Sequence, residues 1–243
     1  MPRSARIALL AAAAFAVMIV ARLPARWVVP RTGTIACASV DGSIWSGSCS
    51  AVTFERFALG DLAWELSPLK LLTGALAAHV VLAHGPLTGS AEVTLRSGGR
   101  IELRNLIADL PLDPRQVPHL PPRLRGALHT DLALARLEHG AVTELKGRIE
   151  AHDITQRTGH VTPLGSYALT FPGGGPEPVG TLVDLGGPLA VQGTLRLTRQ
   201  PGYELEGTVA VRPDAPPELV SDLAYLGSPD GLGRRPFNIA GTL

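Results

Sequence analysis

Apolar and polar side chains alternate along most of the chain after residue 27, a pattern typical of strands with one buried face. In residues 191–198, every second position is Val, Gly or Leu, and the positions between them are Gln, Thr or Arg. Residues 203–211 repeat this pattern, so the two segments predict a hairpin with its turn at residues 199–202. Similar phrases predict further strands at residues 74–82, 89–95, 100–106, 126–134, 145–154 and 237–243.

These elements predict an all-β fold, a curved, rolled or folded-over antiparallel sheet that follows an N-terminal transmembrane helix. One or two short helices are expected, at residues 67–72 and 217–226, where a proline suits the first turn. Proline-rich segments at residues 110–122 and 171–178 allow two interpretations, a boundary between subdomains or long loops within one sheet. The same strand pattern on both sides favours the single sheet.

The N-terminus carries an apolar stretch from residue 7 to residue 21, preceded by Arg3 and Arg6. A cleaved signal peptide is one interpretation, but a cut after Ala25 would place the large Leu23 three residues before the cut. An uncleaved anchor is favoured, because Arg22 can snorkel and Trp27 suits a membrane interface. We therefore expect a cytoplasmic segment at residues 1–6, a transmembrane anchor at 7–26 and a periplasmic β domain at 27–243.

Composition fits an exported β domain, with 27 Gly, 21 Pro and a hydrophobic fraction of 45%. The net charge of +1, with acids and bases interspersed, provides no basic surface for nucleic acid. Cys37 and Cys49 are the two cysteines, and in an oxidising compartment they could form a disulfide across a hairpin. Two separate buried thiols remain the alternative.

Motifs for catalysis or cofactor binding are weak. The chain has neither the Gly-x-Ser-x-Gly nor the His-Glu-x-x-His motif, and its glycine runs lack the context of a nucleotide site. The adjacent His152 and Asp153 point to opposite faces of a strand, so they do not form a catalytic pair with each other. We therefore expect a non-enzymatic protein without metal or cofactor. Trp45 and Trp64 suit core packing better than partner contact. The other histidines are scattered along the chain, so we interpret them as structural residues rather than metal ligands; they are His79, His84, His119, His129, His139 and His160.

The order of several phrases resembles the type II secretion system protein N family over nearly the whole chain. Two phrases carry most of the resemblance, Val-Asp-Gly-Ser-Ile-Trp-Ser-Gly at residues 40–47 and Leu-Ala-Trp-Glu-Leu-Ser-Pro-Leu-Lys-Leu-Leu-Thr-Gly at 62–74. Shorter phrases follow at residues 124–126, 145–147, 164–167, 186–189 and 226–231. The landmark positions, which the resemblance and the strand pattern single out together, are Gly42, Trp45, Gly47, Trp64, Pro68, Leu71, Gly74, Gly126, Gly147, Gly165, Gly193, Gly207, Gly227, Gly231 and Gly241.

The resemblance implies an accessory inner-membrane component of the secretion apparatus that exports folded proteins from the periplasm. Its partners would be other inner-membrane platform proteins. The family is also similar to AsmA-like proteins, which implies a second possibility, a periplasmic lipid-binding or lipid-transfer protein with an apolar β groove. A periplasmic hydrolase is the least favoured possibility. The cysteine pair matches no requirement of the family, and we interpret it as a local staple.

Overall fold

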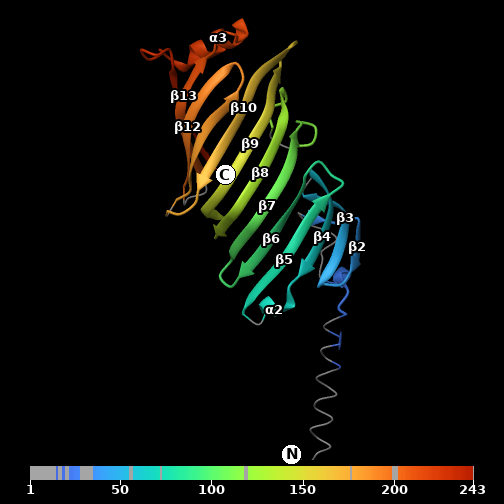
Figure 1. Cartoon of the computed structure of the whole chain (residues 1–243). Coiled ribbons are helices and arrows are strands. Elements are labelled where there is room, and N and C mark those ends of the chain that lie inside the picture. The colour runs from blue at the N-terminus through green and yellow to red at the C-terminus, as the bar shows by residue number, and fades with distance from the viewer. Residues whose placement is uncertain are drawn as a thin grey trace, which may run out of the picture.

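The computed structural model describes residues 15, 18–19, 22–27, 35–54, 57–71, 73–117, 120–175, 177–198 and 202–242. Within them, the strands form one 14-stranded sheet in which β3 to β14 follow the order of the chain and every pairing is antiparallel (Figure 1). The elements are η1 (Ala25–Trp27), β1 (Ile35–Ala36), β2 (Ser39–Gly42), β3 (Ser46–Phe54), β4 (Phe57–Leu66), α2 (Pro68–Leu71), β5 (Ala75–Ala83), β6 (Thr88–Arg96), β7 (Arg100–Leu112), β8 (Leu124–Glu138), β9 (Ala141–Arg157), β10 (Val161–Pro172), β11 (Val179–Gly186), β12 (Leu189–Thr198), β13 (Gly202–Val211), α3 (Pro217–Leu223), η2 (Ala224–Leu226) and β14 (Arg235–Thr242).

The structure confirms the predicted all-β fold and its two short helices. The predicted hairpin is β12–β13, and its register places Val191 opposite Val209 and Leu195 opposite Leu205. The sheet continues across both proline-rich segments, which agrees with the single-sheet interpretation. Because every second strand runs in the same direction, α2 lies at one end of the sheet and α3 at the other (Figure 1).

Two strands extend into the proline-rich segments that were interpreted above as loops, β7 beyond residue 110 and β10 beyond residue 171. Pro111 lies inside β7, and Pro163 and Pro172 lie inside β10. β7 pairs with β6 only as far as Asp109, so Pro111 has a strand neighbour on one side alone. Both prolines of β10 likewise pair with β9 beyond the ends of the β11 pairing. A proline is tolerated there because no second neighbour needs its missing N–H.

The sheet buries two apolar clusters, and its curvature helps to cover them (Figure 1). Leu132, Ala135, Leu145 and Phe171 form a buried cluster on β8, β9 and β10, and Leu195 from β12 packs against it. A second cluster joins Val191 and Val209 to Leu223 of α3, so the helix covers this cluster. In a β-sandwich, a second sheet covers the apolar side chains of the first. Within the described chain, the curvature of the single sheet and α3 cover them instead.

Three non-glycine residues with positive φ mark irregularities that bend the sheet. They are Ala51, Asn105 and Asp153, with φ of 49°, 49° and 50°. The β3–β4 register shifts at Ala51, and the β6–β7 register shifts at Asn105. Side chains of neighbouring strands satisfy the displaced N–H groups, since Asp61 accepts from Ala51 at 2.9 Å and Ser166 from Asp153 at 3.0 Å. Such bulges increase the local twist of a sheet.

Large side chains lie over glycines of the neighbouring strand. A Cβ on Gly47 would lie 2.6 Å from the Trp64 ring, and one on Gly241 would lie 2.8 Å from the Tyr203 ring. At Gly207 a Cβ would lie 2.7 Å from the Phe237 ring and 2.3 Å from the carbonyl oxygen of Gln192. These glycines let an aromatic ring lie flat across the adjacent strand, where any side chain would collide with it.

The first edge of the sheet is closed covalently. β1 and β2 both pair with β3, and the Cys37–Cys49 disulfide joins the segment between them to β3 with a Cα–Cα distance of 5.7 Å. This confirms the predicted disulfide. The chain before β1 also contacts this edge, because Pro24 forms a β-bridge with Ser43.

The predicted anchor at residues 7–26 falls mostly outside the described residues. Among those that are described, no helix has the length and apolar character needed to cross a membrane. The predicted cytoplasmic segment, residues 1–6, lies outside them altogether.

We expect Gly207→Ala to destabilise the sheet by about 2 kcal/mol, because the new methyl group would overlap the Gln192 carbonyl and the Phe237 ring. Urea unfolding followed by circular dichroism measures the change. Gly231→Ala is the matched control, since a Cβ there meets no atom within 4 Å, and its midpoint should stay unchanged. Equal midpoints for both variants would contradict the packing described for Gly207.

Replacing both cysteines with serine should lower the unfolding free energy by about 3 kcal/mol, because the disulfide closes a loop with a sequence separation of 12. Amide hydrogen exchange should speed up first in β1 and β2, the strands that it holds to β3. Reduction of the unaltered chain is the control and should reproduce the effect. Unchanged exchange in both experiments would show that the edge is held by its hydrogen bonds alone.

Candidate functional site

The two phrases that carry the family resemblance meet at the end of the sheet nearest the N-terminal segment. In the β2–β3 turn, the backbone N–H groups of Trp45 and Ser46 both donate to Ser43 Oγ at 3.2 Å. The indole Nε1 of Trp64 donates to the carbonyl oxygen of Ile44 at 3.1 Å, with its ring over Gly47. Trp45 and Trp64 are both half-buried, and the network fixes this turn to β4.

Backbone hydrogen bonds connect this turn to the chain on both sides. Ile44 N–H donates to the carbonyl oxygen of Leu23 at 3.0 Å, and Leu66 N–H donates to that of Trp45 at 2.6 Å. Pro68 begins α2 and Leu71 ends it, with Lys70 in its last turn. Residues 22–27, the β2–β3 turn and α2 therefore form one connected end of the molecule, which we call the N-terminal end surface.

The other landmark glycines are distributed over the sheet and do not gather into one site. They occupy tight turns, bulges and close strand contacts rather than a ligand pocket. Positive φ angles occur in turns or at element ends at Gly42, Gly74 and Gly227, and near shifts of strand register at Gly126, Gly147 and Gly165. Gly193 and Gly207 face each other on β12 and β13, and Gly241 lies under Tyr203. Gly231 lies in the open loop after η2.

The opposite end of the sheet carries a second set of exposed apolar residues. Leu219 and Leu223 of α3 are buried, whereas Val220 on its outer side is 52% exposed. Tyr225 of η2 and Leu232 of the loop after it are 91% and 74% exposed. We call Val220, Tyr225 and Leu232 the distal apolar patch.

Hydrogen bonds hold the loop beneath this patch in place. Asp230 Oδ1 accepts from the N–H groups of Leu232 at 2.9 Å and Arg234 at 2.8 Å, and these bonds lower the pKa of Asp230. Nearby, Arg212 Nη2 lies 2.6 Å from Asp184 Oδ1. Burial is the largest single influence on Asp184 and raises its pKa. The hydrogen bonds from Arg212 and from the Val191 and Gly186 N–H groups, together with the Arg212 charge, outweigh burial and leave the pKa of that carboxyl lowered. The Asp230 bonds therefore order the loop that carries Leu232, whereas Val220 and Tyr225 lie on α3 and η2.

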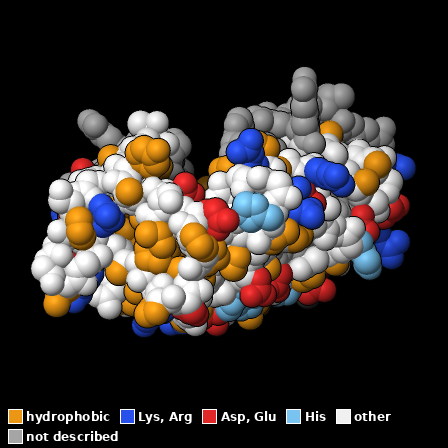
Figure 2. All heavy atoms as spheres, turned by 90° about the horizontal axis from the view of Figure 1, so that it is seen from above, with side chains coloured by type: hydrophobic (Ala, Val, Ile, Leu, Met, Phe, Trp, Pro, Cys, Tyr) orange, Lys and Arg blue, Asp and Glu red, His pale blue; other side chains and the backbone are white. Residues whose placement is uncertain are grey.

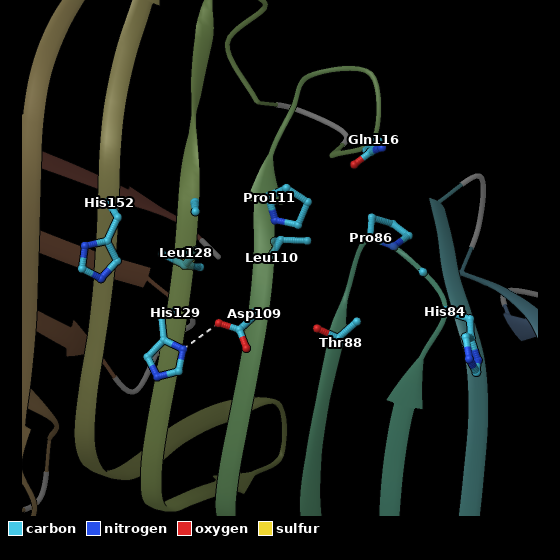
Figure 3. Close-up of a pocket in the computed structure, with 12 residues that line it drawn as sticks. His84, Pro86, Thr88, Asp109, Leu110, Pro111, Gln116, Leu128, His129 and His152 are labelled. Carbon is cyan, nitrogen blue, oxygen red and sulfur yellow. Dashed lines mark hydrogen bonds and ion pairs between the residues drawn. The ribbon is translucent and has the colours of Figure 1, made fainter.

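A hollow with a volume of about 1040 Å³ lies between the β5–β6 turn and the loop after β7 (Figure 3). His129 of β8 points toward Asp109 of β7, and its Nδ1 lies 2.7 Å from Asp109 Oδ1. This hydrogen bond raises the pKa of His129. His84 and His152 also line the hollow, but they pair with other carboxylates, Asp61 at 3.3 Å and Glu150 at 2.9 Å.

The hollow does not assemble a nucleophile. Thr88, Asp109 and His129 lie side by side on three adjacent strands, so the carboxylate separates the hydroxyl from the imidazole. A hydrolase triad needs the imidazole in the middle. In the described parts of the chain, no three His, Cys, Asp or Glu residues lie close enough together to hold a metal ion. The arrangement suits polar contact with another chain better than acid–base catalysis.

Sequence reasoning did not find the distal apolar patch or the His129–Asp109 pair. The pattern of residues 217–226 predicted a short helix but did not show which side chains stay exposed beyond it. Asp109 and His129 meet only through the β7–β8 register, to which no local motif points.

Seen from above, hydrophobic side chains gather near the middle of the surface with acidic and histidine side chains beside them (Figure 2).

Comparison with known proteins gives one consistent result. The family model for type II secretion system protein N matches residues 34–238, which include almost the whole sheet. The chain is 26% identical to type II secretion system protein N of Vibrio cholerae and 27% identical to that of Aeromonas hydrophila, over the full length of each chain. No solved structure matches it. The resemblance seen in the landmark phrases is thereby confirmed: the chain belongs to the type II secretion system protein N family.

Proposed function

We propose that the chain is an accessory inner-membrane component of the type II secretion system that supports the export of folded proteins from the periplasm across the outer membrane. A single N-terminal segment would hold it in the inner membrane, with the β sheet in the periplasm. The observation that carries the proposal is the family match across residues 34–238. That range begins just before β1 and ends within β14, so the match concerns the folded domain itself.

The disulfide supports a periplasmic position for the sheet. Disulfides persist in the bacterial periplasm and are rare in the cytosol, where thiols are kept reduced. Cys49 is fully buried, so the bond is an integral part of the β2–β3 edge. Positive charge before the apolar stretch, from Arg3 and Arg6, supports a cytoplasmic N-terminus.

The described residues of the apolar stretch support the anchor. Phe15, Met18 and Ile19 are helical, and their side chains are 65%, 57% and 51% exposed. Three large apolar side chains exposed so close together are costly in water and favourable in a bilayer. The chain would enter the sheet through residues 22–27, whose backbone bonds to the β2–β3 turn.

For contact with other platform proteins, we propose the distal apolar patch. Asp230 holds the loop that carries Leu232, and the exposed Tyr225 is of a residue type that is enriched among the side chains contributing most to protein interfaces. It lies at the end of the sheet away from residues 22–27, which would point it into the periplasm (Figure 1). No cofactor or catalytic residue is needed for this role.

A lipid-binding groove is the weaker alternative. The fully apolar cavity on β5, β6 and β7 has a volume of about 110 Å³, whereas ligand pockets usually measure about 300–1,000 Å³. The larger hollow is lined by His84, His129 and Asp109, which do not suit an acyl chain. The comparisons with known proteins add no support for this alternative.

Deleting the gene in its host should reduce export of enzymes that fold in the periplasm, and the full chain should restore it. In the same assay, the double variant Tyr225→Ser, Leu232→Ser should leave export reduced by about tenfold, because truncating interface anchors weakens binding strongly. Enzyme activity in the medium and in the periplasm measures the effect.

The control is Ile107→Thr, which removes an apolar side chain that is 47% exposed in the middle of the sheet and should restore export fully. Immunoblots must show equal amounts of all variants. Normal export after gene deletion would contradict the proposed function. Normal export with the double variant alone would contradict only the assignment of the contact surface.

A further inference from the structure

We propose that the N-terminal end surface lies on the phospholipid bilayer, so that the β domain contacts the membrane directly and is not held there by its anchor alone. This inference rests on the proposed membrane anchor and deepens it. The surface comprises residues 22–27, the β2–β3 turn and α2. Backbone hydrogen bonds join residues 22–27 to the turn, and Leu66, two residues before α2, bonds to Trp45 in the same turn.

Large apolar side chains project from both outer segments of this surface. Trp27 is 71% exposed, and Leu69 and Leu71 of α2 are 77% and 42% exposed. None of them belongs to either buried cluster of the sheet. A Trp and two Leu side chains left uncovered at the same end of the sheet are typical of an interfacial contact, where the indole ring lies at headgroup level.

The charges of this surface point to lipid headgroups. Arg22, Arg26 and Lys70 accompany the apolar side chains, and residues 22–27 and 67–74 contain no Asp or Glu. Asp41 and Glu65 lie beside the β2–β3 turn of this surface. The opposite end of the sheet is more acidic, since residues 212–234 hold four acids, Asp214, Glu218, Asp222 and Asp230, against two bases, Arg212 and Arg234. Basic residues beside exposed Trp and Leu suit anionic phospholipids, whereas the acidic end would be repelled by them.

The position of the surface in the chain selects a membrane over a protein partner. The apolar stretch at residues 7–21 ends immediately before Arg22, and η1 at Ala25–Trp27 is fixed to the β2–β3 turn by the Pro24–Ser43 bridge. An anchor attached through so short a connection leaves this end little room to move away from the bilayer. Leu69 and Lys70 would then meet the headgroup region.

The test uses the full chain in vesicles of phosphatidylcholine and phosphatidylglycerol, with Leu69→Cys carrying an environment-sensitive fluorescent probe. Leu232→Cys is the matched control, because both leucines are similarly exposed, at 77% and 74%, at opposite ends of the sheet. Brominated acyl chains should quench the probe at residue 69 at least about twofold more than at residue 232, as expected for side chains inserted roughly 5–10 Å deep. Trp27→Cys provides a second probe position on the same surface.

An alkaline wash of the vesicles separates the two proposals. If the chain stays with the vesicles and residues 27 and 69 are quenched, the inference is supported. If it stays but both probes report water, bilayer docking is overturned while the anchor stands. If the wash releases the chain, the anchor is contradicted, and bilayer docking falls with it.

Discussion

The whole architecture depends on one constraint: a single sheet must bury its apolar clusters with little help from a second layer. The sheet meets it by curving until Leu195 of β12 reaches the cluster around Leu132 and Phe171, while α3 covers the remaining end with Leu223. Curvature in turn requires bulges, because a regular ladder twists evenly and does not fold back on itself. The positive φ angles at Ala51 and Asp153, and the side chains that satisfy their N–H groups, therefore serve the same purpose as the core.

The same sheet holds two chemically different ends apart. One end carries Arg22, Arg26 and Lys70 beside exposed apolar side chains and is connected to the N-terminal segment. The other end has more acids than bases and presents Tyr225 on η2 and Leu232 on a loop held by Asp230. Hydrogen-bonded ladders between all neighbouring strands from β3 to β14 make the described body continuous. A component of a secretion platform with this shape could fix a partner at a defined distance from the membrane without any reaction chemistry.

Much of the fold followed from local pattern, because a half-buried strand leaves a period of two in the sequence and a hairpin turn leaves glycine and proline. The β12–β13 hairpin, both short helices and the disulfide were predicted on that basis. The continuation of β7 through Pro111 and of β10 as far as Pro172 was not predicted, because a proline is tolerated wherever the neighbouring strand has already stopped. The bulges at Ala51 and Asn105, the His129–Asp109 pair and the exposure of Leu232 depend on register between strands, to which no short motif points.

The up-and-down order of the strands also affects how the chain acquires its structure. From β3 to β14, each strand pairs with the one made just before it, so no strand must wait for a partner from the far end of the sequence. Sheets of low contact order fold faster than those joined by distant segments. A β domain that emerges from a translocation channel with β1 first could therefore add one strand at a time to a growing edge, with the disulfide closing near the start. β14 is completed last, at the edge opposite Cys37 and Cys49.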